Sequence, residues 1–220
     1  LIESQIRVLA KSSYLKILDI SIEFTSADSF KLLQEIEEES YSNFNQMRKV
    51  AENKVRNILV ERFQEAWVTQ RGDLRTMQGD PTSLINQESA FRTIIRNMFP
   101  NIDPVGLLNK LKSDATFFVD ASKEHLEAED QLTWIEESEI NSSKITKHDV
   151  PILDYLDYLI NEPIRKWGHI AIDEAQDLTP MQLAMVSRRL DTNATLSLAG
   201  DLAQATGTQY YEDWQGILVL

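Results

Sequence analysis

The chain has 220 residues, of which 42% are hydrophobic and 26% are charged, as in soluble globular proteins that bury a core. It contains no cysteine, which excludes disulfide-linked folds and thiolate metal sites. The formal net charge of −13 disfavours a protein whose main surface binds nucleic-acid phosphates, because such surfaces depend on Lys and Arg.

The start of the chain and its apolar runs bear on where the protein acts. The opening segment LIESQIRVLAKSS has no apolar core of the kind found in signal peptides, and it does not begin with Met. The apolar runs are only a few residues long, much shorter than a membrane span. We therefore expect a cytoplasmic protein without membrane contact, and an internal piece of a longer chain.

The first seventy residues predict mainly helix. Ile20, Ile22 and Phe24 alternate as in a short strand, and Ser26 followed by residues 27–39 is typical of a capped helix. Apolar residues at three- and four-residue steps then predict one long helix with a single buried stripe. The stripe consists of Met47, Val50, Ala51, Val55, Ile58, Leu59, Phe63, Ala66 and Trp67. The same stretch holds cations that form either a solvated helix face, which we favour, or a basic patch: Arg48, Lys49, Lys54, Arg56, Arg62 and Arg71.

The middle of the chain is also expected to be helical, so that residues 1–165 contain at most one short strand. Helices are predicted over residues 82–98, 104–112, 123–137 and 149–161, and Asp103 is a good N-cap before Pro104. In the last of these helices the expected buried side consists of Ile152, Leu153, Leu156, Leu159 and Ile160. Residues 120–139 carry eight acidic residues and one lysine, which favours a solvated face over an acidic docking surface.

The pattern changes after residue 167. Residues 169–172 and 195–199 are two short apolar runs, and Pro180 begins a predicted helix over residues 181–190 between them. Strand, helix and strand in about thirty residues predict a right-handed βαβ unit and hence a parallel sheet. Ligands of such sheets bind at the carboxyl ends of the strands.

Acidic residues come directly after the first of these strands, in the string Asp173-Glu174-Ala-Gln-Asp177. A nucleoside triphosphatase needs one carboxylate to hold Mg²⁺ through its water shell and another to accept a proton from the attacking water. Asp173 is placed for the first task and Glu174 for the second. The alternative, a solvated acidic loop, is weakened by a matching string after the second strand.

That second string is Gly200-Asp201-Leu-Ala-Gln204. A glutamine just past a neighbouring parallel strand can reach the γ-phosphate or the attacking water, so Gln204 is a candidate sensor and Asp201 a candidate nucleotide-binding residue. The two strings together resemble motifs II and III of the UvrD/Rep-like superfamily 1 helicases. The resemblance implies ATP and Mg²⁺ as cofactors, with Asp173 for Mg²⁺, Glu174 as catalytic base and Gln204 as γ-phosphate sensor.

A longer resemblance, over residues 168–183, Arg188-Arg189 and residues 200–207, is to the HelD family. Those proteins are helicase-like ATPases that bind bacterial RNA polymerase and release stalled or post-termination complexes. Residues 22–28, 99–104, Leu107-Leu108 and residues 149–154 resemble, more loosely, the helical insertion that pries at the polymerase clamp. The implied fold is α/β: a partial RecA-like P-loop NTPase sheet carrying motifs II and III, over residues 149–220, with a large mainly α-helical insertion over residues 1–148.

Two departures from the helicase pattern shape the functional expectations. Residues 205–207 read Ala-Thr-Gly where the helicases often have aromatics that stack on bases; Tyr210, Tyr211 and Trp214 come later. No phosphate-binding G-x-x-x-x-G-K-[ST] loop occurs, so we expect this chain alone to be inactive.

Three interpretations of the function stay open. The favoured one is part of an ATPase that remodels RNA polymerase, with weak nucleic-acid binding. A translocating DNA helicase and a purely protein-binding helical module in residues 1–165 are the alternatives.

Overall fold

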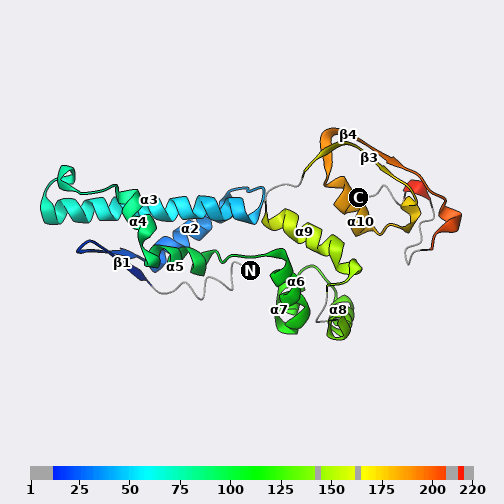
Figure 1. Ribbon diagram of the computed structural model, residues 1–220. Coiled ribbons are helices and arrows are strands. Elements are labelled where there is room, and N and C mark those ends of the chain that lie inside the picture. Colours follow the sequence, from blue (N-terminus) through cyan, green and yellow to red (C-terminus); the bar gives the residue numbers. More distant parts are fainter. Residues whose placement is uncertain (1–11, 142–144, 162–164, 207–212, 216–220) are drawn as a thin grey trace. The chain divides into compact units, whose positions relative to one another are not determined.

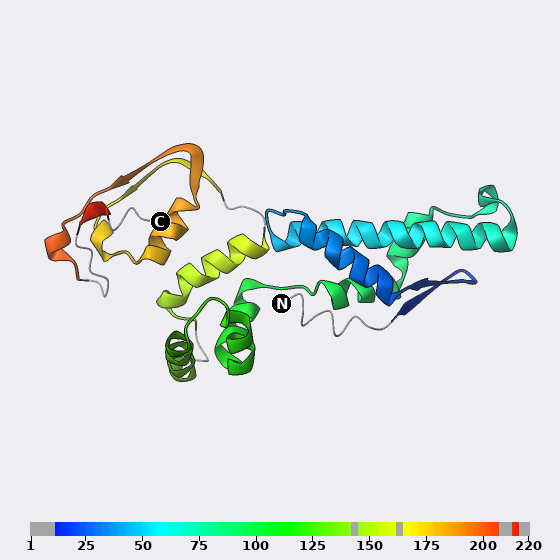
Figure 2. The same ribbon diagram turned by 180° about the vertical axis from the view of Figure 1, so that it is seen from behind.

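The computed structural model describes residues 12–141, 145–161, 165–206 and 213–215, and these form two compact units that divide between residues 102 and 103 (Figures 1 and 2). The structure is mixed α/β, mostly helical, with two small two-stranded sheets. Among the described helices, none combines the length and the apolar character needed to cross a bilayer. The domain boundary predicted after residue 148 falls inside the second unit and stays a prediction.

The first unit combines a β-hairpin with helices. Its elements are β1 (Ser13–Ile17), β2 (Ile20–Phe24), α2 (Ser26–Glu38), α3 (Phe44–Arg71), η1 (Leu74–Thr76), α4 (Pro81–Gln87) and α5 (Ser89–Met98). The strand near residues 20–24 is confirmed, but the expectation of at most one strand before residue 165 is wrong. β1 pairs antiparallel with β2 because a lone strand leaves its backbone groups without partners, and the pair buries Leu15, Ile17 and Ile22 on one face.

Helix α3 supplies the core of the first unit, as predicted. Its stripe buries Ala51, Val55, Leu59, Phe63 and Trp67, and the other predicted members pack against this core as partly buried residues. α2 begins with a capping box in which Thr25 and Asp28 exchange hydrogen bonds. The helix predicted over residues 82–98 is divided into α4 and α5, because the backbone at Glu88 is extended.

In its described residues, the second unit contains helices followed by a βαβ unit. Its elements are α6 (Pro104–Ser113), α7 (Ala115–Ser122), α8 (Ala128–Asn141), η2 (Lys147–Asp149), α9 (Val150–Ile160), β3 (Trp167–Ile172), η3 (Ala175–Asp177), α10 (Pro180–Ser187), β4 (Leu190–Leu198) and η4 (Leu202–Gln204). The Asp103 cap is confirmed, since its Oδ1 accepts from the Gly106 amide at 2.9 Å. The helix predicted over residues 123–137 is confirmed only from Ala128, where α8 begins, because residues 123–127 form the turn that follows the end of α7 at Ser122.

Helix α9 buries a charge that the apolar pattern did not reveal. Ile160 is buried as predicted, but Leu159 is 44% exposed and Asp154 is buried instead. Asp154 Oδ2 accepts from Arg188 Nη2 at 2.7 Å, and its Oδ1 accepts from Arg189 Nη2. Arg188 and Arg189 lie in the turn between α10 and β4, so this ion pair ties α9 to the βαβ unit.

Strands β3 and β4 pair in parallel, which confirms the predicted pairing (Figure 1). Ile170, Ala171 and Ile172 lie opposite Leu196, Ser197 and Leu198. The predicted helix over residues 181–190 ends early, at Ser187, and β4 begins at Leu190, five residues before the predicted strand. The described residues form this two-stranded parallel sheet and no larger one, so a RecA-like sheet stays a prediction.

Candidate functional site at the carboxyl end of the parallel sheet

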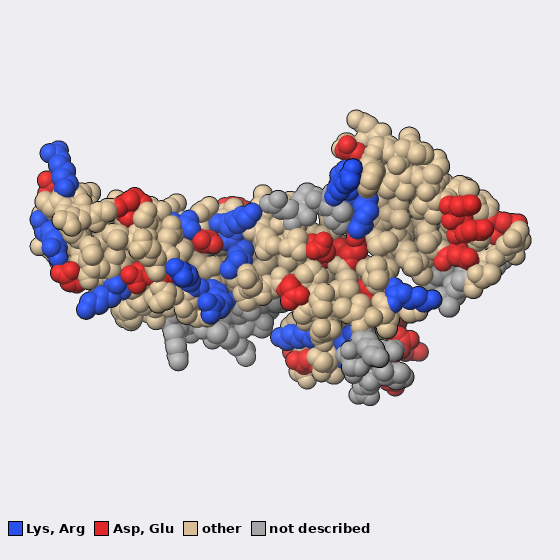
Figure 3. Space-filling model, in the orientation of Figure 1, with Lys and Arg blue, Asp and Glu red and all other residues tan. Residues whose placement is uncertain are grey.

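The carboxyl ends of β3 and β4 bring the two predicted strings to one edge. The Ala199 amide donates to the Ile172 carbonyl at 2.9 Å, and the Ala175 amide donates to the Ala199 carbonyl at the same distance. The strand ladder thus continues into both loops. Figure 3 shows acidic side chains grouped where η3 and η4 lie. Asp173, Glu174 and Asp201 therefore share this edge, and their side chains are exposed.

Gln176 is the residue that joins the two loops. Its side chain is only 1% exposed, and its Nε2 donates to Glu174 Oε2 at 2.7 Å. Its Oε1 accepts from the Asp201 amide at 3.1 Å. One buried amide therefore holds the candidate base on one loop and the start of the other loop. The sequence pattern predicted no role for Gln176, although it lies inside the string that marked the site.

The backbone of Glu174 has an uncommon conformation. Its φ of 55° and ψ of 39° place it in the left-handed region, which side-chain-bearing residues rarely adopt. The Glu174 amide donates to Asp173 Oδ1 at 3.0 Å, and η3 begins at the next residue. Such strain persists where surrounding structure imposes it, often at functional sites. Here it turns the chain sharply, so that Glu174 reaches Gln176.

Asp201 and Gln204 contact each other on the second loop. Asp201 Oδ1 caps η4 by accepting from the Ala203 amide at 3.0 Å, and its Oδ2 accepts from Gln204 Nε2 at 2.9 Å. In the described part of the chain, the Gln204 side chain forms no hydrogen bond with Glu174 or Asp173. The structure therefore places the candidate sensor beside Asp201 and not beside the candidate base.

A second pair of hydrogen bonds joins the two loops, between Asp177 and Thr206. Asp177 Oδ1 accepts from the Thr206 amide at 2.8 Å, and its Oδ2 accepts from Thr206 Oγ1 at 3.1 Å. The sequence pattern did not reveal this pair because the two residues are 29 positions apart. Of the aromatics noted after Gln204, Tyr210 and Tyr211 lie outside the described residues, as does Gly207; Trp214 is half-buried.

The donor set at this edge fits the manner in which Mg²⁺ is usually held. Mg²⁺ keeps several waters and binds one or two carboxylates together with substrate phosphates. Asp173 and Asp201 provide exposed carboxylates on adjacent loops. Over the described ranges, no cluster of three or more acidic or histidine side chains could hold a metal ion by itself.

Gly200 is expected to be indispensable to this arrangement. A Cβ there would lie 2.0 Å from Gln176 Oε1 and 3.2 Å from the Ala175 amide nitrogen. Because Gln176 is buried and bonded at both ends, Gly200→Ala should break its hydrogen bond to the Asp201 amide and lower the free energy of unfolding by about 1–3 kcal/mol. Hydrogen exchange at the Asp201 amide should then be clearly faster than in the parent chain.

A matched glycine provides the control for that variant. A Cβ at Gly168, in β3, meets no atom within 4 Å, so Gly168→Ala should leave the Asp201 amide unchanged. Equal exchange rates at Asp201 in both variants and the parent chain would show that Gln176 does not hold the two loops together.

A scan of the chain against protein-family models gives no match, and a search of curated proteins gives none. The function therefore has to be inferred from the residues at this edge and from the motifs they form.

Proposed function

We propose that this chain is part of a HelD-like superfamily 1 ATPase of the cytoplasm that remodels or recycles bacterial RNA polymerase. The observation that carries the proposal is the juxtaposition of the two strings at one end of a parallel strand pair, held by Gln176 between Glu174 and the Asp201 amide. A metal-holding carboxylate, a base and a residue that contacts the γ-phosphate are among the groups that triphosphate hydrolysis requires.

Each residue has a separate task in this proposal. Mg²⁺, held by Asp173 through water, would neutralise phosphate charge when ATP is bound. Glu174 accepts the proton of the attacking water, and its bond from Gln176 Nε2 at 2.7 Å orients the carboxylate. When ATP is bound, the Gln204 side chain leaves Asp201 and forms a hydrogen bond with the γ-phosphate. When this phosphate is lost, the Gln204 amide returns to its hydrogen bond with Asp201.

The preference for a protein partner over DNA rests on the charges of the first unit. Residues 1–150 carry 25 acidic and 18 basic side chains. Several cations of α3 are already paired with carboxylates of the same unit. These pairs are Arg62 with Asp28 at 2.5 Å, Lys54 with Glu35 at 2.9 Å and Arg71 with Asp19 at 2.6 Å. Cations held in this way contribute little to phosphate binding, which draws its affinity from counterion release.

Titrations of the 220-residue chain at two salt concentrations test this preference. Binding to single-stranded DNA should be weak, with a dissociation constant of roughly 10⁻⁴ M or higher at physiological salt. Binding to core RNA polymerase should survive moderate salt, since apolar contacts at the centre of an interface are little screened. Tight, steeply salt-dependent DNA binding without polymerase binding would instead favour a UvrD/Rep-like translocating helicase.

A further inference from the structure

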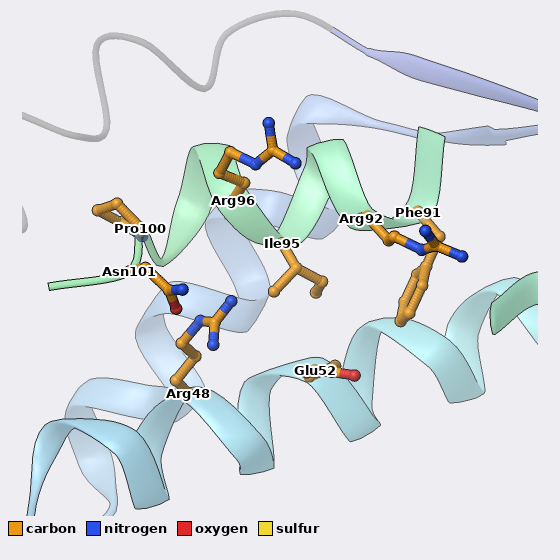
Figure 4. Close-up of a pocket in the computed structure, with 8 residues that line it drawn as sticks. All are labelled: Arg48, Glu52, Phe91, Arg92, Ile95, Arg96, Pro100 and Asn101. Carbon is orange, nitrogen blue, oxygen red and sulfur yellow. The ribbon is translucent and has the colours of Figure 1, made fainter. Parts of the chain in front are cut away.

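A pocket with a volume of about 480 Å³ lies between α3 and α5 in the first unit (Figure 4). Part of its lining is apolar and comes from Phe91, Ile95 and Pro100. The polar part includes three arginines, Arg48 from α3 and Arg92 and Arg96 from α5. Its size is within the range of sites for small molecules, which are typically apolar with a few convergent polar groups.

The arginines of this pocket differ from the cations of α3 that are paired with carboxylates. In the residues that the structure describes, no carboxylate forms an ion pair with Arg48, Arg92 or Arg96, whereas Arg62 and Arg71 each have one such partner and Lys54 has two. Glu52 also lines the pocket, but its Oε1 accepts from Arg56 Nη2 at 2.7 Å. The acid is thereby neutralised from its own helix, and the pocket keeps the charge of its three arginines.

Arg48 is held in position for a ligand. Its Nε donates to the Phe99 carbonyl at 3.0 Å, which fixes the guanidinium near Asn101 and leaves its two terminal nitrogens available (Figure 4). Arg92 has only a long contact, 3.5 Å from Nη2 to the Asn86 carbonyl, and its side chain is exposed. Arg96 is exposed as well and extends from the side of α5 away from α3, so both can reorient toward a ligand.

We propose that this pocket binds a small phosphate monoester. A monoester carries a charge of about −1.5 to −2 at neutral pH, which matches several arginines better than the single charge of a carboxylate. Guanidinium groups bind phosphate oxygens through paired hydrogen bonds. The organic part of the ester would contact Phe91, Ile95 and Pro100. A long polyanion is disfavoured by the net charge of −13.

This site is separate from the proposed ATPase edge. All of its lining residues belong to the first unit, whereas Asp173, Glu174 and Gln204 belong to the second. The proposal thus stands or falls independently of the function proposed above.

Calorimetric titration of the 220-residue chain with phenyl phosphate tests the proposal, with benzoate and inorganic phosphate as comparison ligands. Phenyl phosphate should bind about tenfold more tightly than either, since benzoate lacks the second charge and inorganic phosphate lacks the ring. Arg48→Gln and, separately, Arg92→Gln should each weaken the binding of phenyl phosphate about tenfold. Arg92 has no short structural contact, so its variant reports binding even if Arg48→Gln unfolds the unit.

The control is Arg75→Gln, which removes the same charge from an exposed position of the same unit outside the pocket. It should change the affinity less than twofold. The proposal is overturned if benzoate binds as tightly as phenyl phosphate, if Arg75→Gln weakens binding as much as Arg92→Gln, or if phenyl phosphate shows no binding at millimolar concentration.

Discussion

Glu174→Gln in the full-length protein should lower ATP turnover by about 10²–10⁴-fold while ATP affinity changes little, because the base is lost and the phosphate contacts remain. The substitution keeps the size of the side chain, and the amide oxygen of glutamine can still accept from Gln176 Nε2, which now lies 2.7 Å from Glu174 Oε2. Steady-state turnover and equilibrium nucleotide binding measure the two quantities separately.

The control for this variant is Asp191→Asn, which removes one exposed carboxylate from β4 outside the candidate site. It should leave turnover within about twofold of the parent, since surface substitutions away from such features have small effects. The 220-residue chain, which has no phosphate-binding loop motif, should show negligible turnover by itself. Robust hydrolysis by this chain, or an active Glu174→Gln protein, would contradict the assignment of Glu174.

Asp154→Ala should lower the free energy of unfolding by about 3 kcal/mol, because it leaves two partly buried arginines without their carboxylate. The Asp154 side chain is 6% exposed, against 15% for Arg188 and 30% for Arg189. Because Arg189 can recover part of its hydration, the expected loss of stability is at the low end of the range for breaking a buried ion pair. Chemical denaturation at neutral pH measures it.

Acid should remove the same stabilisation. Burial raises the pKa of Asp154, but the hydrogen bonds from Arg189 and Arg188 outweigh burial and keep its pKa below the ordinary value. A lowered carboxyl pKa stabilises the fold above its unfolded value of ~3.9, and the contribution is lost as the pH falls further. The difference between Asp154→Ala and the parent should therefore shrink below pH ~4.

Asp157→Ala is the matched control on α9, since Asp157 Oδ1 accepts from the neutral Asn161 side chain at 2.6 Å. This variant should lower the free energy of unfolding by about 1 kcal/mol, the usual net contribution of a hydrogen bond to a neutral partner. If Asp157→Ala were as destabilising as Asp154→Ala, the ion pair to Arg188 and Arg189 would not be what ties α9 to the βαβ unit.

The fold was predictable where local pattern and long-range packing agree. The stripe of α3 could be predicted because apolar side chains at helical spacing have one way to be buried. The first strand of the hairpin, β1, was missed because Tyr14 and Lys16 interrupt its apolar residues, and only the pairing with β2 shows the alternation. Asp154 was missed for a related reason, since its partners are 34 and 35 residues away in sequence.

The candidate site shows the same division. The positions of Asp173 and Glu174 at a strand end could be predicted from the motif, and the parallel register brings Asp201 to the same edge. The ties that join the loops could not be predicted, because Gln176 and Thr206 act across 25 and 29 residues. Both connections depend on where the second strand places its loop, which local sequence does not specify.

The most direct test of the proposed function is a pull-down of RNA polymerase with the full-length protein, washed at moderate salt in the absence of DNA. We expect core polymerase to be retained, because binding should rest on protein contacts. Addition of ATP should release the polymerase or change the amount retained. Failure to retain polymerase, together with retention of single-stranded DNA in a separate pull-down and DNA-stimulated ATP hydrolysis, would contradict the proposal and identify a DNA-translocating enzyme instead.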